Sequence, residues 1–355
     1  MSEERLEGLR RRISEINRRI LDEVNERLEL VNQVRELKLS RGEPMYDPAR
    51  EGRMFEELVA ANPGPLTSAQ VREVFRPIFE ASLSYMERRA REGLRVNRAP
   101  GEPDRRIEVR GAAIGAGAPV LIAGPCSVES REQLASVAAR LKLLGCRFLR
   151  GGAFKPRTSP YTFQGLGDEG WRLLREVADE HGMAVVSEVV DTRHVEAIAE
   201  LVDVVQVGAR NMYNYELLKL LGQLRRPVLL KRAFSATLEE LLLAAEYVVS
   251  GGNEQVILCE RGIRTFERET RSTLDISAVP LLKAATALPV IVDVAHAAGR
   301  RDLLAPLARA ALAAGADGVM VEVHPFPASA ASDAGHQLDL EGVEAFYRAV
   351  FGSKR

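Results

Sequence analysis

The sequence predicts an α/β protein: a (β/α)8 barrel, the TIM-barrel architecture, preceded by an all-α domain of three helices. From residue 120 on, short runs rich in Val, Ile and Leu alternate with helical patterns, eight times over about 250 residues, which is the rhythm of such a barrel. The runs are apolar throughout, as expected for parallel strands buried on both faces. A doubly wound open sheet is the alternative, but no G-x-G-x-x-G follows the first strand.

Length and composition limit the number of domains and the classes of protein to which the chain can belong. A chain of 355 residues is long enough for two domains, and we expect a helical domain at 1–91, a polar linker at 92–105 and the barrel at 106–355. A formal net charge of -1 argues against nucleic acid as the main partner. Three cysteines without a C-x-x-C pair argue against a disulfide framework or a zinc ribbon. The charged start and the lack of a run of transmembrane length predict a cytoplasmic protein with no membrane partner.

The helical domain is expected to consist of one long helix and two shorter ones. Apolar residues recur at three- and four-residue steps from Leu6 to Leu37, which predicts an amphipathic helix over 3–41. Asp47 and Pro48 read as the cap and first residue of a second helix, and a third begins at about residue 67. Because three unequal helices form a thin core, we expect a homodimer through this domain.

The barrel is expected to follow a small strand pair at 107–114. The predicted strands are Val120–Ala123, Phe148–Arg150, Ala184–Ser187, Val204–Val207, Val228–Leu230, Gln255–Cys259, Val290–Val292 and Gly318–Val321. The helical stretches between them include Gln133–Leu144, Gly170–Glu180, Leu238–Ser250, Ala278–Ala287 and Leu303–Ala314.

A polar or metal-binding group follows the carboxyl end of every predicted strand. Scattered charges would not keep this phase, and in a barrel these positions meet at one mouth, where such enzymes keep their active sites. The groups are Cys126, then Arg150 with Lys155 and Arg157, Glu188, Arg210, Lys231, Arg261, Asp293 with His296, and Glu322 with His324.

Six of these groups are cations: Arg150, Lys155, Arg157, Arg210, Lys231 and Arg261. Three of them lie in a Gly-rich segment that has no acid from Arg150 to Gly167, although an ordinary basic loop would look the same. So many cations in one site would repel one another unless strong anions neutralise them. We therefore expect two phosphorylated substrates, or one phosphate with carboxylates.

A second set predicts a divalent metal ion. Thiolate, imidazole and carboxylate ligands together suit a metal of borderline softness, of the Mn, Co, Fe or Zn type. Taken singly, Cys126 also reads as a small buried residue and His296 as a structural loop histidine. The predicted ligands are Cys126, His296, Glu322 and Asp333.

Several motifs resemble the 3-deoxy-D-arabino-heptulosonate 7-phosphate (DAHP) synthase family, in its compact bacterial type I-beta form. The motifs span about residues 106 to 350 and include Gly124-Pro-Cys126-Ser-Val-Glu, Arg150-Gly-Gly-Ala-Phe-Lys-Pro-Arg-Thr-Ser-Pro-Tyr, Gly208-Ala-Arg210-Asn-Met, Cys259-Glu-Arg261-Gly and Glu322-Val-His-Pro. The resemblance implies condensation of phosphoenolpyruvate with erythrose 4-phosphate, with release of phosphate, as the first step of the shikimate pathway.

The resemblance also implies residue roles. Lys155 becomes a proton donor, Glu188 positions a water, and Asp293 binds a hydroxyl of the aldose, while His296 joins the catalytic set as a metal ligand. The family site implies that phosphoenolpyruvate binds Arg150, Lys155, Arg210, Lys231 and Arg261, and that the aldose phosphate binds Arg157, Thr158 and Ser159. One departure is Asp293-Val-Ala-His296, where many members have Pro-Ser between Asp and His.

A related barrel family, 3-deoxy-manno-octulosonate 8-phosphate synthase, is the main alternative. It uses phosphoenolpyruvate and a five-carbon sugar phosphate. Its loop reads Lys-Ala-Asn-Arg-Ser, whereas this chain has Lys155-Pro-Arg157-Thr-Ser. The loop therefore favours the four-carbon aldose.

The helical domain resembles an all-helical chorismate mutase over about residues 5 to 88. The resemblance implies that Lys38 and Glu51 lie on either side of the ether oxygen and the hydroxyl of chorismate. It also implies that a partner subunit lends its Arg10. Met86 stands at a position that is commonly Gln, and a thioether cannot donate a hydrogen bond to the ether oxygen. The residues that match the family site are Arg10, Arg27, Lys38, Asp47, Arg50 and Glu51.

Three functions remain open for this domain. It is an active mutase that rearranges chorismate to prephenate, a module that senses these compounds and inhibits the barrel, or a dimerisation bundle with solvated charges. The sequence favours sensing with weak mutase activity, in a homo-oligomer that is a dimer through the helical domain and in full a tetramer.

Overall fold

The computed structural model describes residues 3–41, 47–155 and 161–352. The chain divides into two compact units, Met1–Leu94 and Arg95–Arg355. No helix within the described ranges is both long and apolar enough to cross a membrane.

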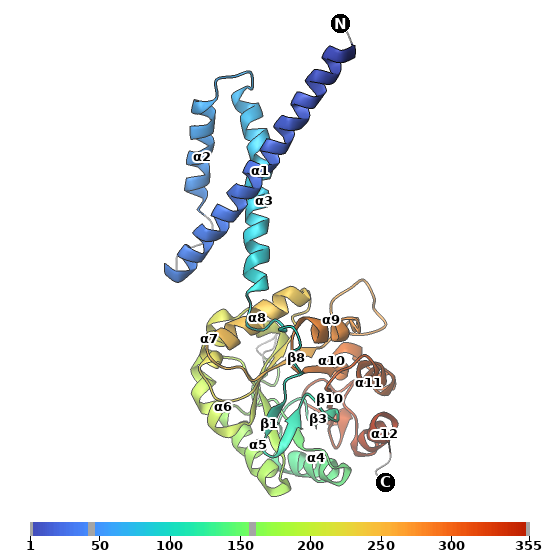
Figure 1. The fold of residues 1–355 in the computed structure, drawn as a ribbon. Coiled ribbons are helices and arrows are strands. Elements are labelled where there is room, and N and C mark those ends of the chain that lie inside the picture. Colours follow the sequence, from blue (N-terminus) through green and yellow to red (C-terminus); the bar gives the residue numbers. More distant parts are fainter. Residues whose placement is uncertain (1–2, 42–46, 156–160, 353–355) are drawn as a thin grey trace. The chain divides into compact units, whose positions relative to one another are not determined.

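The first unit contains three helices (Figure 1), as predicted: α1 (Glu3–Arg41), α2 (Pro48–Ala61) and α3 (Ser68–Glu92). The Asp47 side chain accepts a hydrogen bond from the Arg50 N–H at 3.0 Å, which caps α2. The small core is aromatic, with the rings of Phe55 and Phe79 packed at 4.9 Å.

The amino-terminal half of α1 keeps its apolar stripe open to solvent. Ile13 is 58% exposed and Ile20 is 54% exposed, although residues of this type are normally buried. Within the described part of a single chain, nothing covers this half of the helix. Exposed apolar surface of this kind is typical of interaction sites, and the homodimer predicted from the thin core stays a prediction.

The second unit is a closed barrel of parallel strands in the order β10-β3-β4-β5-β6-β7-β8-β9, which confirms the predicted fold class. Two strands, β4 and β6, have the predicted bounds, and the other six differ from the predicted ones by one or two residues. The strands are β3 (Val120–Gly124), β4 (Phe148–Arg150), β5 (Ala184–Val189), β6 (Val204–Val207), β7 (Val228–Lys231), β8 (Val256–Glu260), β9 (Val290–Asp293) and β10 (Gly318–Glu322).

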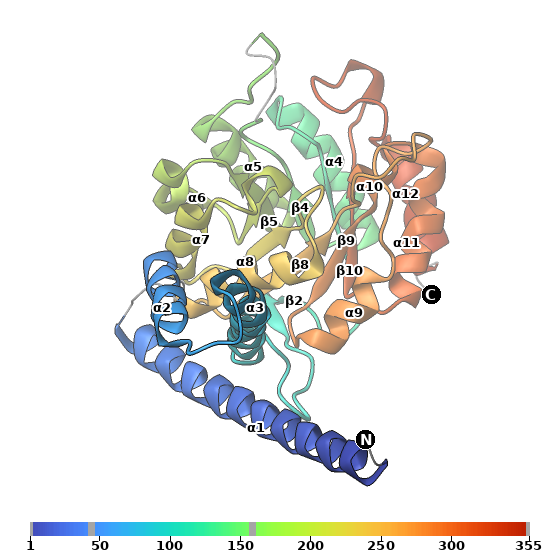
Figure 2. The ribbon, with the colours of Figure 1, turned by 90° about the horizontal axis from the view of Figure 1, so that it is seen from above.

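Helices surround these strands (Figure 2). Most of them join one strand to the next, which is the connection that parallel neighbours require. They are α4 (Arg131–Leu144), α5 (Asp168–His181), α6 (Val195–Leu201), α7 (Tyr215–Gly222), α8 (Leu238–Ser250), α9 (Ala278–Ala285), α10 (Val294–Ala298), α11 (Leu304–Ala313) and α12 (Leu340–Phe351).

An antiparallel hairpin, β1 (Ile107–Val109) with β2 (Ala112–Ile114), belongs to the core of the barrel. Its Ile107, Val109 and Ile114 join one buried apolar cluster with residues from the first halves of the strands, such as Phe148. The hairpin therefore lies at the amino-terminal end of the barrel. The carboxyl end is left for polar side chains.

The stretch predicted as a linker, 92–105, is attached to the barrel over most of its length. Val96 is 1% exposed. The backbone N–H groups of Arg98 and Arg105 donate to the carbonyls of Ala285 and Ala287 at 2.8 and 2.7 Å. The part that belongs to neither core is therefore short.

Candidate functional site

The barrel strands end in charged side chains that meet at the carboxyl end. Arg150, Lys231, Asp293 and Glu322 are the last residues of β4, β7, β9 and β10, and all four are buried. Beside them lies a cavity of about 140 Å³ lined by Arg150, Lys155, Glu188, Gln206, Gly208, Ala209, Arg210, Lys231, Phe234, Arg261, Arg271, His296 and Asp333. Eight of the fourteen residues predicted for the site of the barrel thus line one cavity.

Two of the buried cations are neutralised inside the protein. The Arg150 guanidinium donates to Glu322, and the Lys231 ammonium donates to Asp293. Burial disfavours both carboxylates, but the nearby cations and histidines outweigh it and hold the pKa of Glu322 and Asp293 well below the ordinary values. Both acids are therefore ionised and accept hydrogen bonds only.

Other cations of the cavity lack such a carboxylate partner among the described residues, Arg210 and Arg261 among them. Among the residues that the structure describes, no carboxylate lies within ion-pair distance of Arg210 or Arg261. Arg261 is 3% exposed and donates to the Ser272 hydroxyl at 3.0 Å and to the Gly262 carbonyl at 3.2 Å. Burial lowers the pKa of its guanidinium. A buried guanidinium that has only neutral partners favours an incoming anion.

Lys155 reaches the same cavity from the loop after β4. Its ammonium donates to the Cys126 carbonyl at 2.9 Å and to the Cys126 sulfur at 3.0 Å. Burial opposes the charge on Lys155, but its neighbours Cys126 and Glu322 outweigh this effect and raise the pKa of the ammonium. Lys155 is thus protonated, as a proton donor must be.

Phe154 fixes the start of this loop. Its ring packs against the rings of Trp171 at 4.8 Å and His194 at 4.6 Å, while the N–H of Lys155 donates to the Gln164 carbonyl at 2.8 Å. The predicted ligands of the aldose phosphate, Arg157, Thr158 and Ser159, lie outside the described residues.

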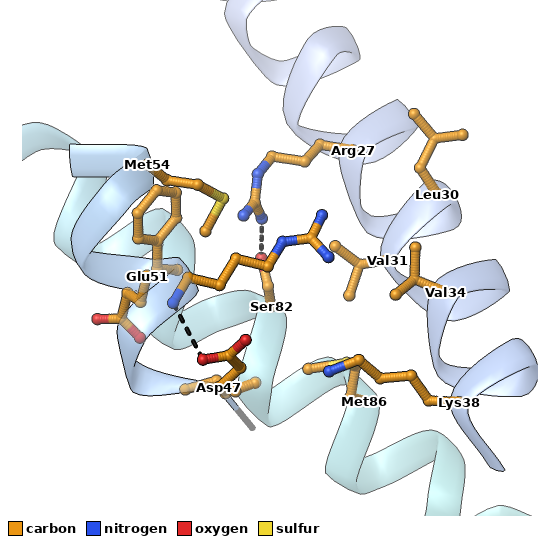
Figure 3. A pocket seen from close by; sticks show the side chains of 13 residues that line it. Arg27, Leu30, Val31, Val34, Lys38, Asp47, Glu51, Met54, Ser82 and Met86 are labelled. Atoms are coloured by element: carbon orange, nitrogen blue, oxygen red, sulfur yellow. Dashed lines mark hydrogen bonds between the residues drawn. The ribbon is translucent and has the colours of Figure 1, made fainter. Parts of the chain in front are cut away.

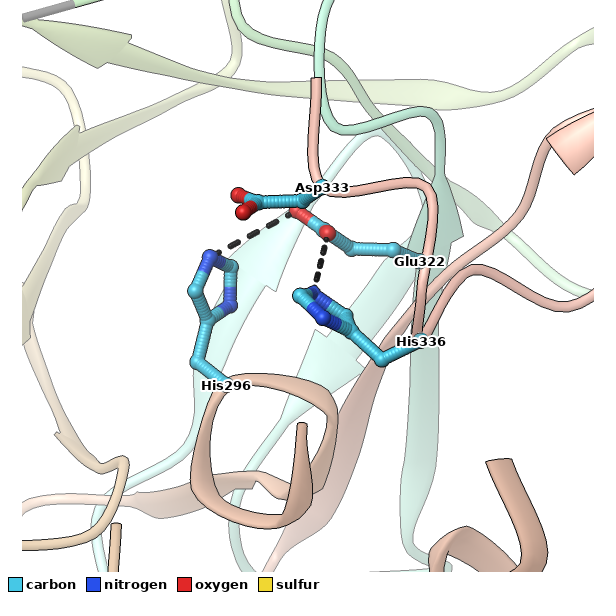
Figure 4. Close-up of side chains that lie close together, drawn as sticks. All are labelled: His296, Glu322, Asp333 and His336. Atoms are coloured by element: carbon cyan, nitrogen blue, oxygen red, sulfur yellow. Dashed lines mark hydrogen bonds and ion pairs between the residues drawn. The ribbon is translucent and has the colours of Figure 1, made fainter. Parts of the chain in front are cut away.

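A compact group of metal-binding side chains lies beside the cavity. One ligand atom from each of His296, Glu322, Asp333 and His336 lies within 4.8 Å of the others, and the side chains point toward one another (Figure 4). His296 Nδ1 lies 2.8 Å from an Asp293 oxygen. Because ionised Asp293 only accepts, Nδ1 carries the proton and Nε2 keeps the lone pair that a metal needs.

Cys126 lies at the edge of this group. Its sulfur is 3.2 Å from an Asp333 oxygen, although it does not belong to the four-residue cluster. Burial, together with the charge of Glu322, raises the pKa of the thiol to about 12. The thiol therefore stays protonated until a cation replaces its proton, as soft divalent metals do. The donor set of sulfur, imidazole and carboxylate fits such a metal.

The structure also shows the surroundings of two other predicted residues, Glu188 and Asp293. Glu188 lines the cavity and accepts from the Gln206 amide at 3.1 Å. Asp293 is fully buried between Lys231 and His296, so its contact with an aldose hydroxyl stays a prediction.

His324 lies outside the group of His296, Glu322, Asp333 and His336. Its Nδ1 accepts from the Phe326 N–H at 3.0 Å, and its Nε2 faces Glu129 at 3.4 Å.

Sequence reasoning missed His336. It follows Asp333 by three residues in a segment without strand or helix, and its Nε2 lies 2.9 Å from Glu322 Oε2. Gln206 and Phe234 were missed as well. Gln206 lies inside an apolar strand, and Phe234 carries no charge, so the search for ionisable groups passed over both.

The helical unit contains a second cavity, of about 280 Å³, between its helices (Figure 3). Five of the six residues predicted for a chorismate site line it: Arg27, Lys38, Asp47, Arg50 and Glu51. The remaining residues that line the cavity are Leu30, Val31, Val34, Met54, Phe79, Ser82, Leu83 and Met86.

Arg27 lies at the centre of this cavity. It donates to the Ser82 hydroxyl, its guanidinium carbon lies 4.8 Å from the centre of the Phe79 ring, and burial lowers its pKa. Met86 lines the wall where a donor was expected. A half-buried guanidinium without a carboxylate partner among the described residues is suited to a carboxylate ligand.

Arg10 does not line this cavity. It lies seventeen residues before Arg27 on α1, which is about 25 Å along a helix, and it pairs with Glu7 at 2.8 Å. It cannot reach the cavity of its own chain, which agrees with the expectation that a partner subunit lends it.

Comparisons with known proteins match both units. Residues 98–354 match the model of the DAHP synthetase I family, and residues 9–87 match the model of chorismate mutase type II. The two matched ranges together cover most of the chain and fall on opposite sides of the division at Leu94.

Individual relatives of the chain agree with the match to the barrel family. Phospho-2-dehydro-3-deoxyheptonate aldolase of Thermotoga maritima is 53% identical over 246 residues, which cover 69% of this chain and 73% of the relative. Its crystal structure superposes with a TM-score of 0.70 at 51% identity, covering 72% of this chain and 75% of that chain. A 2-dehydro-3-deoxyphosphooctonate aldolase of Syntrophobacter fumaroxidans is 32% identical over 255 residues, covering 67% of this chain and 88% of the relative.

His336 offers a test of the metal group. Because ionised Glu322 accepts from His336, that histidine holds the Glu322 carboxylate in position. His336→Ala should weaken Mn²⁺ binding about 10- to 100-fold. His336→Gln should stay close to wild type, because the glutamine amide can donate in its place. Calorimetric titration of the chelator-treated protein with Mn²⁺ measures both.

His181→Ala is the control, since it removes an imidazole at the end of α5, outside the metal group. Equal losses of affinity in His336→Gln and His336→Ala would contradict a positioning role and make His336 a ligand itself.

Proposed function

Because the chain belongs to the DAHP synthetase I family, we propose that its barrel condenses phosphoenolpyruvate with erythrose 4-phosphate and releases inorganic phosphate. The observation that carries this proposal is the cavity at the carboxyl end of the barrel. Arg210 and Arg261 have no carboxylate partner there among the described residues, while a metal-binding group lies beside them. A dianionic phosphate and a carbonyl that needs polarising fit these two features.

Phosphoenolpyruvate would bind the cations that line the cavity. Its phosphate is assigned to Arg210 and Arg261, which have the unbalanced charge. Its carboxylate then lies toward Lys155, Arg150 and Lys231 in the interior. Arg157, Thr158 and Ser159 are proposed for the aldose phosphate on the strength of the motif alone.

The proposed metal ligands are Cys126, His296, Glu322 and Asp333. Their donor atoms fit a divalent ion of the Mn, Co, Fe or Zn type. When bound, such an ion supplies Lewis acidity to the aldehyde oxygen. Asp293 orients His296 through Nδ1, and His336 orients Glu322.

Lys155 and Glu188 perform the proton chemistry in this proposal. Carbon 3 of phosphoenolpyruvate forms a bond to the aldehyde carbon, and the aldehyde oxygen takes a proton from the Lys155 ammonium. Glu188, held by Gln206, positions a water that adds to carbon 2. One proton of that water replaces the proton lost by Lys155. The bond between carbon 2 and the phosphate oxygen then breaks, and phosphate leaves with the electron pair. The hydroxyl on carbon 2 gives its proton to the departing phosphate, and its oxygen becomes the ketone oxygen of the product.

The octulosonate-forming reaction is the second candidate, because relatives with that name are about one third identical. The heptonate-forming relative is 53% identical, and the Lys155-Pro-Arg157-Thr-Ser loop has the pattern of the four-carbon aldose family. Both observations favour erythrose 4-phosphate over a five-carbon sugar phosphate.

Phosphate release tests this function. Purified protein supplied with Mn²⁺ should release phosphate from phosphoenolpyruvate only when erythrose 4-phosphate is present. Cys126→Ser should lower this rate about 100-fold or more, because a hydroxyl is a poor replacement for a thiolate ligand. A coupled phosphate assay measures both.

Cys146→Ser is the matched control, because this buried cysteine lies outside the cavity. Full activity of Cys126→Ser in metal-stripped buffer would contradict the metal assignment. Phosphate release with arabinose 5-phosphate in place of erythrose 4-phosphate would favour the octulosonate reaction.

For the helical domain we propose a receptor for chorismate or prephenate that inhibits the barrel, with weak mutase activity of its own. The cavity supports binding of a dicarboxylate, since Arg27, Lys38 and Arg50 line it. Met86 supports the weak activity, because the rearrangement depends on positioning and on hydrogen bonds to the ether oxygen.

A homodimer through α1 completes this proposal. A groove beside the exposed half of α1 is lined by Ile16, Arg19, Ile20, Glu23, Val24, Arg27, Phe75 and Ile78. Covering it with α1 of a second copy would bury the open stripe and bring the partner subunit's Arg10 to the chorismate cavity. A tetramer requires a further interface, which the barrel would have to provide.

Removal of the helical domain tests the receptor. A protein lacking residues 1–94 should keep the condensation activity, because the barrel has its own core. Prephenate should slow condensation by the full chain and leave the truncated protein unaffected. Inhibition that persists after truncation would place the receptor in the barrel.

Met86→Gln tests the weak mutase activity. Glutamine would restore a donor to the ether oxygen, which we expect to raise chorismate turnover about tenfold or more. Met54→Gln, which changes another methionine of the same cavity, is the control. Rapid turnover by the wild type with no gain in Met86→Gln would make the domain a true mutase.

A further inference from the structure

Three arginines surround one aromatic ring at the edge of the barrel cavity. The guanidinium carbons of Arg261, Arg264 and Arg210 lie 4.7, 5.3 and 5.5 Å from the centre of the Phe234 ring. All three distances are within the range of cation–π attraction.

The backbone holds Phe234 in this place. Phe234 lies in the loop between β7 and α8, and its carbonyl accepts a hydrogen bond from the Arg264 N–H at 2.7 Å. This bond joins the loop after β7 to the loop after β8. The ring is half-buried and lines the cavity together with Arg210 and Arg261.

The charges around the ring are not balanced by acids. Among the described residues, no carboxylate lies within ion-pair distance of Arg210, Arg261 or Arg264. Like charges this close repel one another, and two of these side chains, Arg210 and Arg264, are exposed and would otherwise turn toward water. The negative face of the ring attracts each guanidinium without neutralising it. The charge therefore remains available for an anion.

We propose that Phe234 is a positioning residue, whose ring holds Arg210 and Arg261 in the arrangement that binds the phosphate group of phosphoenolpyruvate. Arg264 belongs to the same cluster and fixes the ring through its backbone and side chain. This inference rests on the proposed function for the identity of the ligand. It adds a residue that makes no contact with charge-bearing atoms of the substrate and acts through the two arginines.

Preorganisation explains the expected effect. If the ring keeps the guanidinium groups together before the anion arrives, binding need not pay for bringing them together. Phe234→Leu keeps an apolar side chain but removes the π system. It should weaken phosphoenolpyruvate binding about 5- to 30-fold. The KM for phosphoenolpyruvate should rise by a similar factor, with kcat within about twofold, because uniform binding is lost.

A second variant separates electronic from steric effects. Pentafluorophenylalanine at position 234 keeps nearly the shape of the ring but reverses the charge of its face. It should weaken binding at least as much as leucine does, whereas Phe234→Trp should bind as tightly as wild type. Phe266→Leu is the control, because Phe266 is 96% exposed in the same loop as Arg264.

Calorimetric titration with phosphoenolpyruvate, without the aldose, decides the matter. Binding by both Phe234→Leu and the pentafluoro variant within twofold of wild type would overturn the inference. Loss with leucine alone would also overturn it, since the ring would then serve only as packing.

The outcome is separable from that of the proposed function. Wild type that binds phosphoenolpyruvate but releases no phosphate with erythrose 4-phosphate would refute the function and leave the ring test valid. Wild type that binds neither phosphoenolpyruvate nor inorganic phosphate would overturn the inference.

Discussion

Charge balance at the carboxyl end of the barrel governs the site. The buried acids Glu322 and Asp293 are each held by a cation, Arg150 and Lys231, and by a histidine. These pairs let charged groups exist in the interior at all, since an unpaired buried charge is costly. Arg210, Arg261 and Lys155 then lack an acid within ion-pair distance among the described residues, and we expect a bound anion to complete the site.

Two features of the fold place these charged groups at the carboxyl end of the barrel. The hairpin at the amino-terminal end fills the barrel with apolar side chains, so polar groups gather where the strands end. The backbones of β3 and β4 also approach each other closely at Gly124. A β-carbon on Gly124 would lie 2.0 Å from the Arg150 carbonyl oxygen, and the φ angle of Gly124 is +150°. Only glycine allows β3 and β4 to end side by side there. Arg150 at the end of β4 is thereby placed beside Glu322 of the metal group.

The features that could be predicted from the sequence were those that depend on a regular pattern of apolar residues. The barrel and the phase of Arg150, Lys231, Asp293 and Glu322 came from short apolar runs that alternate regularly with helical patterns. The long first helix came from apolar residues at three- and four-residue steps. His336 and Phe234 could not be found this way, because they reach the site from loops and their roles depend on neighbours far away in sequence. Arg10 illustrates a further limit, since the role proposed for it requires a second molecule, which a single chain cannot show.

A crystal structure of the protein with phosphoenolpyruvate and Mn²⁺ tests this balance of charge most directly. We expect the phosphate within hydrogen-bond distance of both Arg210 and Arg261, and the metal on Cys126, His296, Glu322 and Asp333. A phosphate bound instead by Arg150 or Lys231, with the ion pairs to Glu322 and Asp293 broken, would contradict the view that those two cations are already balanced.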